Sequence, residues 1–186
     1  MRLFFAIELP EEVRAALGRL KPADETRNRD YRWPDPSLLH VTLAFLGEQP
    51  EARLEALERL GRQVALSSPR ATLRLGRTGQ FGSKGSPRVL WVDVAGEVET
   101  LHALQRKLDQ ALRAEGFPLE ERPFRAHITL ARRRETARGG PPPGWPPALE
   151  ALPFELERLT LMQSRLSSRG PTYSPLFQFP LLRASG

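Results

Sequence analysis

The chain is 186 residues long and 40% hydrophobic, which is enough for one compact domain with a substantial core. Its 28 lysines and arginines against 22 aspartates and glutamates give a net charge of +6, which favours a polyanionic partner such as nucleic acid. Arginine supplies most of this charge and suits bidentate contact with phosphate, although base composition or heat adaptation would produce the same bias. Because there is no cysteine, disulfides, thiolate nucleophiles and cysteine-based metal sites are excluded.

The N-terminal apolar run, Leu3 to Ile7, is followed directly by Glu8. It is too short for the core of a signal peptide or for a membrane span. We therefore expect a cytoplasmic protein that does not associate with membranes.

The rest of the chain alternates between two apolar periodicities. Some segments are β-branched and extended, whereas others repeat leucine every three or four residues, as amphipathic helices do. Glycine and proline fill residues 82–87, predicting a hairpin turn, and residues 138–144, predicting an irregular loop. In chain order we expect strands at 2–9, 38–46, 71–81, 88–95, 126–131, 154–162 and 176–182, and helices at about 10–20, 50–64 and 97–115.

One internal repeat is found. The segment His40-Val41-Thr42-Leu43-Ala44 matches His127-Ile128-Thr129-Leu130-Ala131, although the chain has only three histidines. For background residue frequencies such a match has a chance of roughly one in several thousand. Period-two alternation in a strand puts His and Thr on one face and the aliphatic residues on the other.

Two imidazoles with neighbouring hydroxyls are suited to cleaving a phosphodiester by general acid–base catalysis. One neutral histidine accepts a proton from water while one protonated histidine gives a proton to the leaving oxygen. Thr42 and Thr129 can donate hydrogen bonds to the non-bridging phosphate oxygens, where charge gathers in the transition state. The spacing does not indicate which of His40 and His127 is the acid, and the chemistry requires neither a metal nor another cofactor.

Other interpretations of the histidines are possible. A single His-x-Thr segment is ordinarily a half-buried histidine beside a strand-forming residue, but the duplication argues against this. Zinc binding would require further ligands, and threonine is a poor one. His102 lies off the leucine face of its predicted helix, which indicates a solvated surface residue.

At these residues the chain resembles the two-histidine phosphoesterase superfamily, specifically its bacterial and archaeal 2′-5′ RNA ligase branch, whose members are regarded mainly as RNA 2′,3′-cyclic phosphodiesterases. The resemblance spans nearly the whole chain. The segments that carry it, besides the two motifs, are Arg2-Leu3-Phe4-Phe5-Ala6, Leu43 to Glu48, Pro87 to Trp91, Arg122 to His127, and a Ser-x-Leu…Gly…Tyr pattern at Ser164, Leu166, Gly170 and Tyr173.

The resemblance implies an α+β fold over residues 1–186, a single domain of two pseudo-symmetric lobes of antiparallel sheet that face a central cleft, with helices outside. It implies hydrolysis of a 2′,3′-cyclic phosphate to a 2′-phosphate, with His40 as proton donor and His127 as proton acceptor. The expected partner is RNA with a 2′,3′-cyclic phosphate end. We expect a monomer with no obligate protein partner.

Four further residues are candidates for substrate binding. Arg132 follows the second motif, as in similar proteins, and could hold phosphate, although in an ideal strand it points away from His127. Tyr173 and Phe45 are candidates for base stacking, with core packing as the alternative. Ser164 is a candidate through the resemblance alone.

Two competing functions remain open from the sequence. Run in reverse, the same chemistry would join a cyclic phosphate end to a 5′ hydroxyl through a 2′-5′ bond. A non-catalytic module that grips RNA ends would use the same basic surface, but the two intact His-Thr pairs argue against it. Turnover of a cyclic nucleotide separates catalysis from binding alone.

Overall fold

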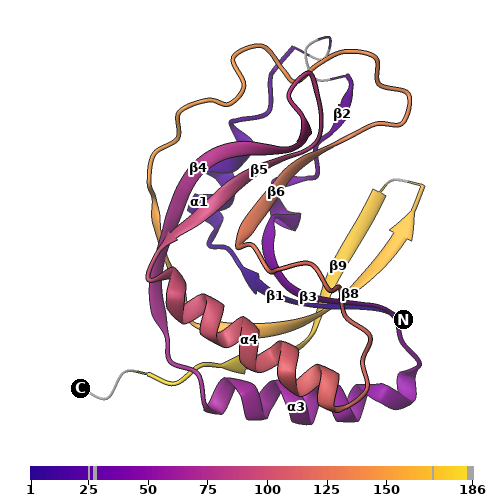
Figure 1. Cartoon of the computed structure of the whole chain (residues 1–186), viewed down its shortest axis with the longest axis vertical. Helices are drawn as coiled ribbons and strands as arrows, with labels where there is room; N and C mark the ends of the chain where they lie inside the picture. Colours follow the sequence, from indigo (N-terminus) through magenta and orange to yellow (C-terminus); the bar gives the residue numbers. More distant parts are fainter. Residues whose placement is uncertain (25, 27–28, 169, 184–186) are drawn as a thin grey trace.

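The computed structural model describes residues 1–24, 26, 29–168 and 170–183. Its antiparallel strands form one strongly curled nine-stranded sheet (Figure 1). The strands are β1 (Arg2–Glu8), β2 (Tyr31–Arg32), β3 (His40–Glu48), β4 (Ala71–Ser83), β5 (Ser86–Gly96), β6 (His127–Arg133), β7 (Pro153–Leu156), β8 (Arg158–Ser167) and β9 (Gly170–Pro180). The helices are α1 (Glu11–Gly18), α3 (Leu54–Leu66) and α4 (Val98–Ala114), with short 3-10 turns at Pro36–Leu38 and Glu51–Arg53.

The strand order divides the sheet into two matching halves. The order is β7-β4-β5-β6-β3-β1-β8-β9, with β2 paired to β6 at one side. Each half therefore places its motif strand, β3 or β6, at the centre of the sheet. The two motif strands pair at a single position, Val41 opposite Ile128, and these are the residues that directly follow the two motif histidines.

Alternation along the motif strands separates two faces of the sheet. Val41, Leu43, Ile128 and Leu130 are at most 4% exposed and belong to the main hydrophobic core. The histidines and threonines between them point to the opposite face, which we call the site face. Burying a valine or leucine side chain contributes about 1.5–3 kcal/mol, so these four residues hold both motif strands firmly in place.

The two long helices cover the core face. Helices α3 and α4 lie side by side beneath the sheet (Figure 1), with α3 against β8 and β9 and α4 against β3 and β4. Each buries the apolar stripe expected of an amphipathic helix. The buried residues are Leu57, Leu60, Gly61, Val64 and Ala65 on α3, and Leu101, Leu104, Leu108 and Leu112 on α4.

The expected α+β class with antiparallel sheet and outer helices is confirmed. The two expected sheets are halves of one sheet, because β3 and β6 pair at Val41 and Ile128. The prediction of a single strand at 154–162 is wrong. The strand is interrupted at Glu157, and the two parts, β7 and β8, lie far apart in the order of the sheet. The last strand begins earlier than expected, at Gly170, and β2 was not expected at all.

Strand β2 is too short to show a periodicity, which explains why the sequence gives no sign of it. Its Tyr31 is 1% exposed, and the phenol donates a 2.8 Å hydrogen bond to the carbonyl of Pro87. This bond ties the segment before the first motif to the β4–β5 hairpin. Within the described residues, no helix combines the length and the apolarity needed to span a membrane.

Helix α3 packs tightly against the sheet at Gly61. A Cβ atom there would lie 2.8 Å from Cζ of Phe179 on β9. At an open helical position Gly→Ala stabilises by about 1 kcal/mol, whereas overpacking a core costs about 1–3 kcal/mol. We therefore predict that Gly61→Ala lowers the free energy of unfolding, measured by urea denaturation.

The matched control is Gln63→Ala on the exposed side of the same helix. It should change the free energy of unfolding by less than about 0.5 kcal/mol. Stabilisation by Gly61→Ala would contradict the close contact between α3 and β9.

Candidate active site

The two motif histidines are held by the same local hydrogen bond. Nδ1 of His40 lies 2.7 Å from the carbonyl oxygen of Leu38, and Nδ1 of His127 lies 2.7 Å from that of Arg125. In each case the acceptor is two residues before the histidine. Because a carbonyl only accepts, Nδ1 carries the proton in both rings, and Nε2 is the nitrogen left for proton transfer.

The pairing of β3 with β6 arranges the four polar side chains crosswise. With Val41 opposite Ile128 in an antiparallel pair, His40 lies on the side of Thr129 and Thr42 on the side of His127. Nε2 of His40 also lies 2.9 Å from Oγ1 of its own motif partner, Thr42. Each imidazole is therefore near hydroxyl groups, and the two motifs present their polar groups to one shared region.

A β-bulge follows each motif threonine and changes the direction of the residues after it. On β6, Thr129 pairs with Trp91 but Ala131 pairs with Leu90, so Leu130 is an extra residue and the alternation shifts by one. Arg132 consequently turns to the same face as His127. The ideal-strand geometry that would point Arg132 away from the histidine is therefore wrong here.

The same bulge occurs on β3. Thr42 pairs with Ala6 and Ala44 with Phe5, so Leu43 is the extra residue. Phe45 then turns to the site face, opposite Phe4. Phe45 and Arg132 thus occupy equivalent positions in the two halves of the sheet, each three residues after its motif threonine.

Aromatic rings enclose His40. Its ring centroid is 5.0 Å from that of Phe4 and 5.3 Å from that of Tyr173, which meets it edge to face. Phe4 and Tyr173 also contact each other at 5.1 Å. Tyr173 on β9, a predicted candidate for base stacking, thus contacts the imidazole of His40 directly.

A different group encloses His127. The Phe81 ring meets the imidazole edge to face, with centroids 5.2 Å apart, and Phe81 lies 5.2 Å from Trp91. The guanidinium of Arg125 lies over Trp91, 4.4 Å from the ring centroid. Gly79 makes room for this packing, because a Cβ atom there would lie 2.5 Å from Cζ2 of Trp91.

Each histidine has a carboxylate opposite it on the neighbouring strand. Glu8 pairs with His40 and Asp93 with His127. Glu8 is engaged elsewhere, since its Oε2 accepts hydrogen bonds from Thr160 at 2.8 Å and from Gln178 at 2.7 Å. The two halves therefore share a plan but differ in the charge that each histidine experiences.

Burial is the main influence on both imidazoles. Burial lowers the pKa of His40, the positive charges of His127 and Arg132 lower it further, and the hydrogen bond to Leu38 opposes them. Burial likewise lowers the pKa of His127, helped by Arg132 and Arg125, while the bond to Arg125 and the Asp93 carboxylate act in the raising direction. The charge of His127 is thus one of the influences that lower the pKa of His40.

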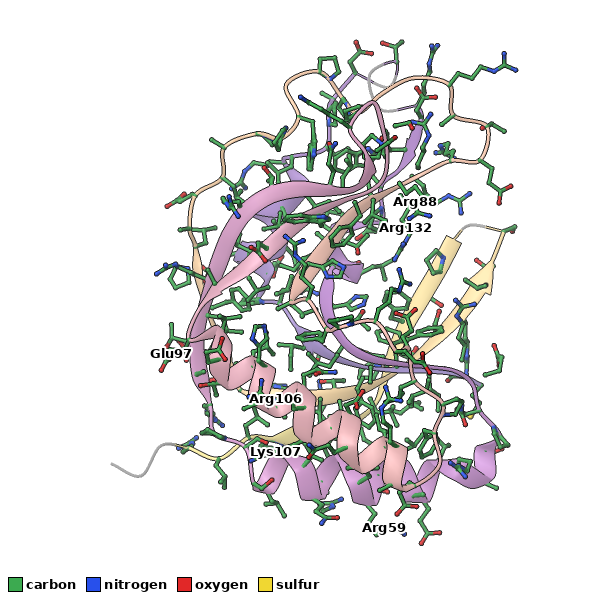
Figure 2. The ribbon with its side chains drawn as sticks, viewed as in Figure 1. Arg59, Arg88, Glu97, Arg106, Lys107 and Arg132 are labelled. Carbon is green, nitrogen blue, oxygen red and sulfur yellow. The ribbon has the colours of Figure 1, made fainter. Side chains whose placement is uncertain are left out.

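Arg132 is the cation common to this site. Its charge lowers the pKa of His40, His127 and Tyr173, whereas burial of the Tyr173 phenol raises the pKa of that group. Figure 2 labels Arg132 on β6, the strand that carries His127. A phosphate between the two imidazoles would therefore meet a guanidinium.

The remaining predicted residues lie at the edges of this site. Ser164 on β8 is 9% exposed and pairs with Tyr173 and with Arg2. His102 lies on α4, where it faces Glu99 at 3.4 Å. Sequence patterns did not single out Phe4, Phe81, Trp91 and Asp93, which approach the histidines through strand pairing and ring packing. They also missed Arg125, whose backbone carbonyl binds His127.

The donor set does not form a metal site. Across residues 1–24, 26, 29–168 and 170–183, no three histidine, cysteine, aspartate or glutamate side chains converge as ligands. Two imidazoles with two hydroxyls and an arginine are instead suited to proton transfer and to binding an oxyanion.

The chain was compared with known proteins. It is 39% identical over 191 residues to an RNA 2′,3′-cyclic phosphodiesterase of Thermus thermophilus, covering 97% of this chain and 90% of the relative. It is 32% identical to the RNA 2′,3′-cyclic phosphodiesterase of Escherichia coli, covering 97% and 96%. The structure of E. coli LigT complexed with 3′-AMP superposes with a TM-score of 0.77 at 31% identity, covering 97% of both chains.

The match to a family model is equally extensive. The model of the 2′-5′ RNA ligase superfamily matches residues 9–167, a range that includes both His-x-Thr motifs and both bulges. The chain therefore belongs to the 2′-5′ RNA ligase superfamily.

Proposed function

We propose that this protein is an RNA 2′,3′-cyclic phosphodiesterase that opens the cyclic phosphate to a 2′-phosphate. The observation that carries the proposal is the presence of two imidazoles on one face of neighbouring strands, each with Nδ1 bonded to the carbonyl two residues earlier and Nε2 left for proton transfer. Relatives that bear this activity in their names match nearly the full chain.

The proposed reaction uses the two histidines in opposite protonation states. Neutral His127 removes a proton from water as the water oxygen attacks phosphorus. Protonated His40 gives its Nε2 proton to the departing 3′ oxygen as the bond from phosphorus to that oxygen breaks. Solvent then restores both protonation states. The order of roles follows the family resemblance, and Asp93 opposite His127 stabilises the imidazolium formed there.

The transition state gathers negative charge on the non-bridging phosphate oxygens. Thr42, Thr129 and Arg132 supply donors to these oxygens from both halves of the sheet. A positioned donor of this kind contributes roughly a hundredfold to a thousandfold in rate. The crosswise arrangement across Val41 and Ile128 lets one threonine from each motif reach the phosphate.

We further propose that the protein is a single domain and acts as a monomer. Residues 1–186 form one bilobal domain, which is supported by the continuous sheet and by a hydrophobic core drawn from both halves. The protein acts as a monomer on RNA ends, because one chain supplies both histidines and both threonines. The reverse reaction, which forms a 2′-5′ bond, is a second candidate favoured by the family to which the chain belongs.

The test of the function is turnover of an oligoribonucleotide with a 2′,3′-cyclic phosphate end in the presence of EDTA. We predict hydrolysis unaffected by the chelator, with the product phosphate on the 2′ oxygen as judged by phosphorus NMR. Loss of activity in EDTA and its return with zinc or manganese would overturn the proton-transfer mechanism. A 3′-phosphate product would overturn the proposed leaving group.

A second prediction concerns the cooperation of the histidines. His40→Ala and His127→Ala should each lower kcat by roughly a hundredfold to ten-thousandfold, because each removes a positioned proton-transfer group. The double variant should lose far less than the product of the single losses, since groups that act as a unit are not additive. Steady-state kinetics with a melting curve for each variant provides the measurement.

His102→Ala is the matched control, because it removes the third imidazole from helix α4. It should retain wild-type turnover. A folded His40→Ala or His127→Ala variant with near-wild-type kcat would contradict the proton-transfer role proposed for that histidine.

A further inference from the structure

Arg2 lies on the site face, one strand away from the β3 motif. It pairs with Ser164 on β8, and Ser164 pairs with Tyr173 on β9. Directly paired residues in antiparallel strands project to the same side of the sheet. Arg2, Ser164 and Tyr173 therefore form a row across three strands, and this row ends at the ring that contacts His40.

The Arg2 guanidinium is held by an aromatic ring. Its central carbon lies 5.0 Å from the centroid of Phe45, within the range of a cation–π interaction. Phe45 occupies the position equivalent to Arg132 in the other half of the sheet. One half thus carries a cation at this position directly, and the other half carries an aromatic residue with a cation placed over it.

This contact leaves the hydrogen-bonding edge of Arg2 available. In the described part of the chain, no hydrogen bond or ion pair involves the Arg2 side chain. Glu48, opposite Arg2 on β3, lies 3.2 Å from the N-terminal amine. A cation–π contact uses none of the N–H donors of a guanidinium, and these donors match the geometry of a phosphate.

Arg2 and Arg132 differ in the groups whose pKa their charges lower. Arg132 influences His40, His127 and Tyr173, whereas Arg2 influences Tyr173 and neither histidine to a resolved extent. Arg2 lies at the opposite end of β1 from Glu8, the residue paired with His40, whereas Arg132 lies on the same strand as His127. Arg2 is therefore farther from the motif histidines than Arg132. A ligand that contacts Arg2 and the histidines together must extend past Tyr173.

We propose that Arg2, supported by Phe45, binds the phosphodiester that joins the cyclic-phosphate nucleotide to its 5′ neighbour. The inference rests on the proposed function. Because a 2′,3′-cyclic phosphate ends the RNA at its 3′ side, the nearest further phosphate lies on the 5′ side of the same nucleotide. The protein then distinguishes an RNA end from a cyclic mononucleotide, because only the RNA end carries the phosphodiester that Arg2 binds.

The test compares a 2′,3′-cyclic mononucleotide with a dinucleotide that ends in the same cyclic nucleotide. Arg2→Gln should raise KM for the dinucleotide roughly fivefold to thirtyfold, through loss of one charged hydrogen-bonding contact, and leave the mononucleotide kinetics unchanged. The dependence of log kcat/KM on log salt should become shallower by roughly 0.7 for the dinucleotide, the value for one single-strand phosphate contact.

The control is Arg62→Gln, which removes the same charge from the exposed face of helix α3, where Arg62 forms an ion pair with Glu58. It should leave the kinetics of both substrates unchanged. Equal effects of Arg2→Gln on both substrates, or none on the dinucleotide, would overturn the assignment. Melting curves verify that each variant folds. Arg2→Lys keeps the charge but loses the planar guanidinium, so it should raise KM for the dinucleotide less than Arg2→Gln does.

Binding provides a readout that does not depend on turnover. Fluorescence anisotropy of a labelled single-stranded oligoribonucleotide should show weaker affinity and a shallower salt dependence for Arg2→Gln than for Arg62→Gln. If the wild-type protein hydrolysed neither substrate, the proposed function would fail, and this binding measurement would still decide the role of Arg2. Identical binding by the two variants would overturn that role.

Discussion

The pairing of Val41 with Ile128 is the constraint on which the site depends. It is the one position at which the described motif strands meet, and both residues are fully buried in the core. Because each directly follows its histidine, burying this pair fixes where both imidazoles emerge on the other face. The chemistry of each half would be incomplete alone, so the contact that joins the halves also assembles the site.

The two halves repeat a backbone plan and vary its side chains. Both histidines bond through Nδ1 to the carbonyl two residues earlier, and both motifs end in a bulge that turns a later residue to the site face. The surroundings then differ, with Phe4 and Tyr173 beside His40 and a charged, stacked Arg125 near His127. Such asymmetry is what opposite proton-transfer roles require from a symmetric frame.

The sequence predicted most of the site but not its surroundings. The repeated His-x-Thr motif carries its own periodicity, so the strands and the common face of His40 and His127 could be inferred. A bulge has no periodic signal, and strict alternation therefore gave Arg132 the wrong direction. The environment of the histidines arises from pairing between residues far apart in the chain, such as Phe4 with Phe45, and no local pattern specifies it.

We propose that the two imidazoles act as one coupled pair, and NMR titration of His40 tests this proposal most directly. The positive charge of His127 lowers the pKa of His40, so His127→Ala should raise the pKa of His40 in the free protein. His102→Ala, on helix α4, should leave the His40 titration unchanged. A His40 titration that did not move when His127 was removed, or that moved to lower pH, would contradict the account.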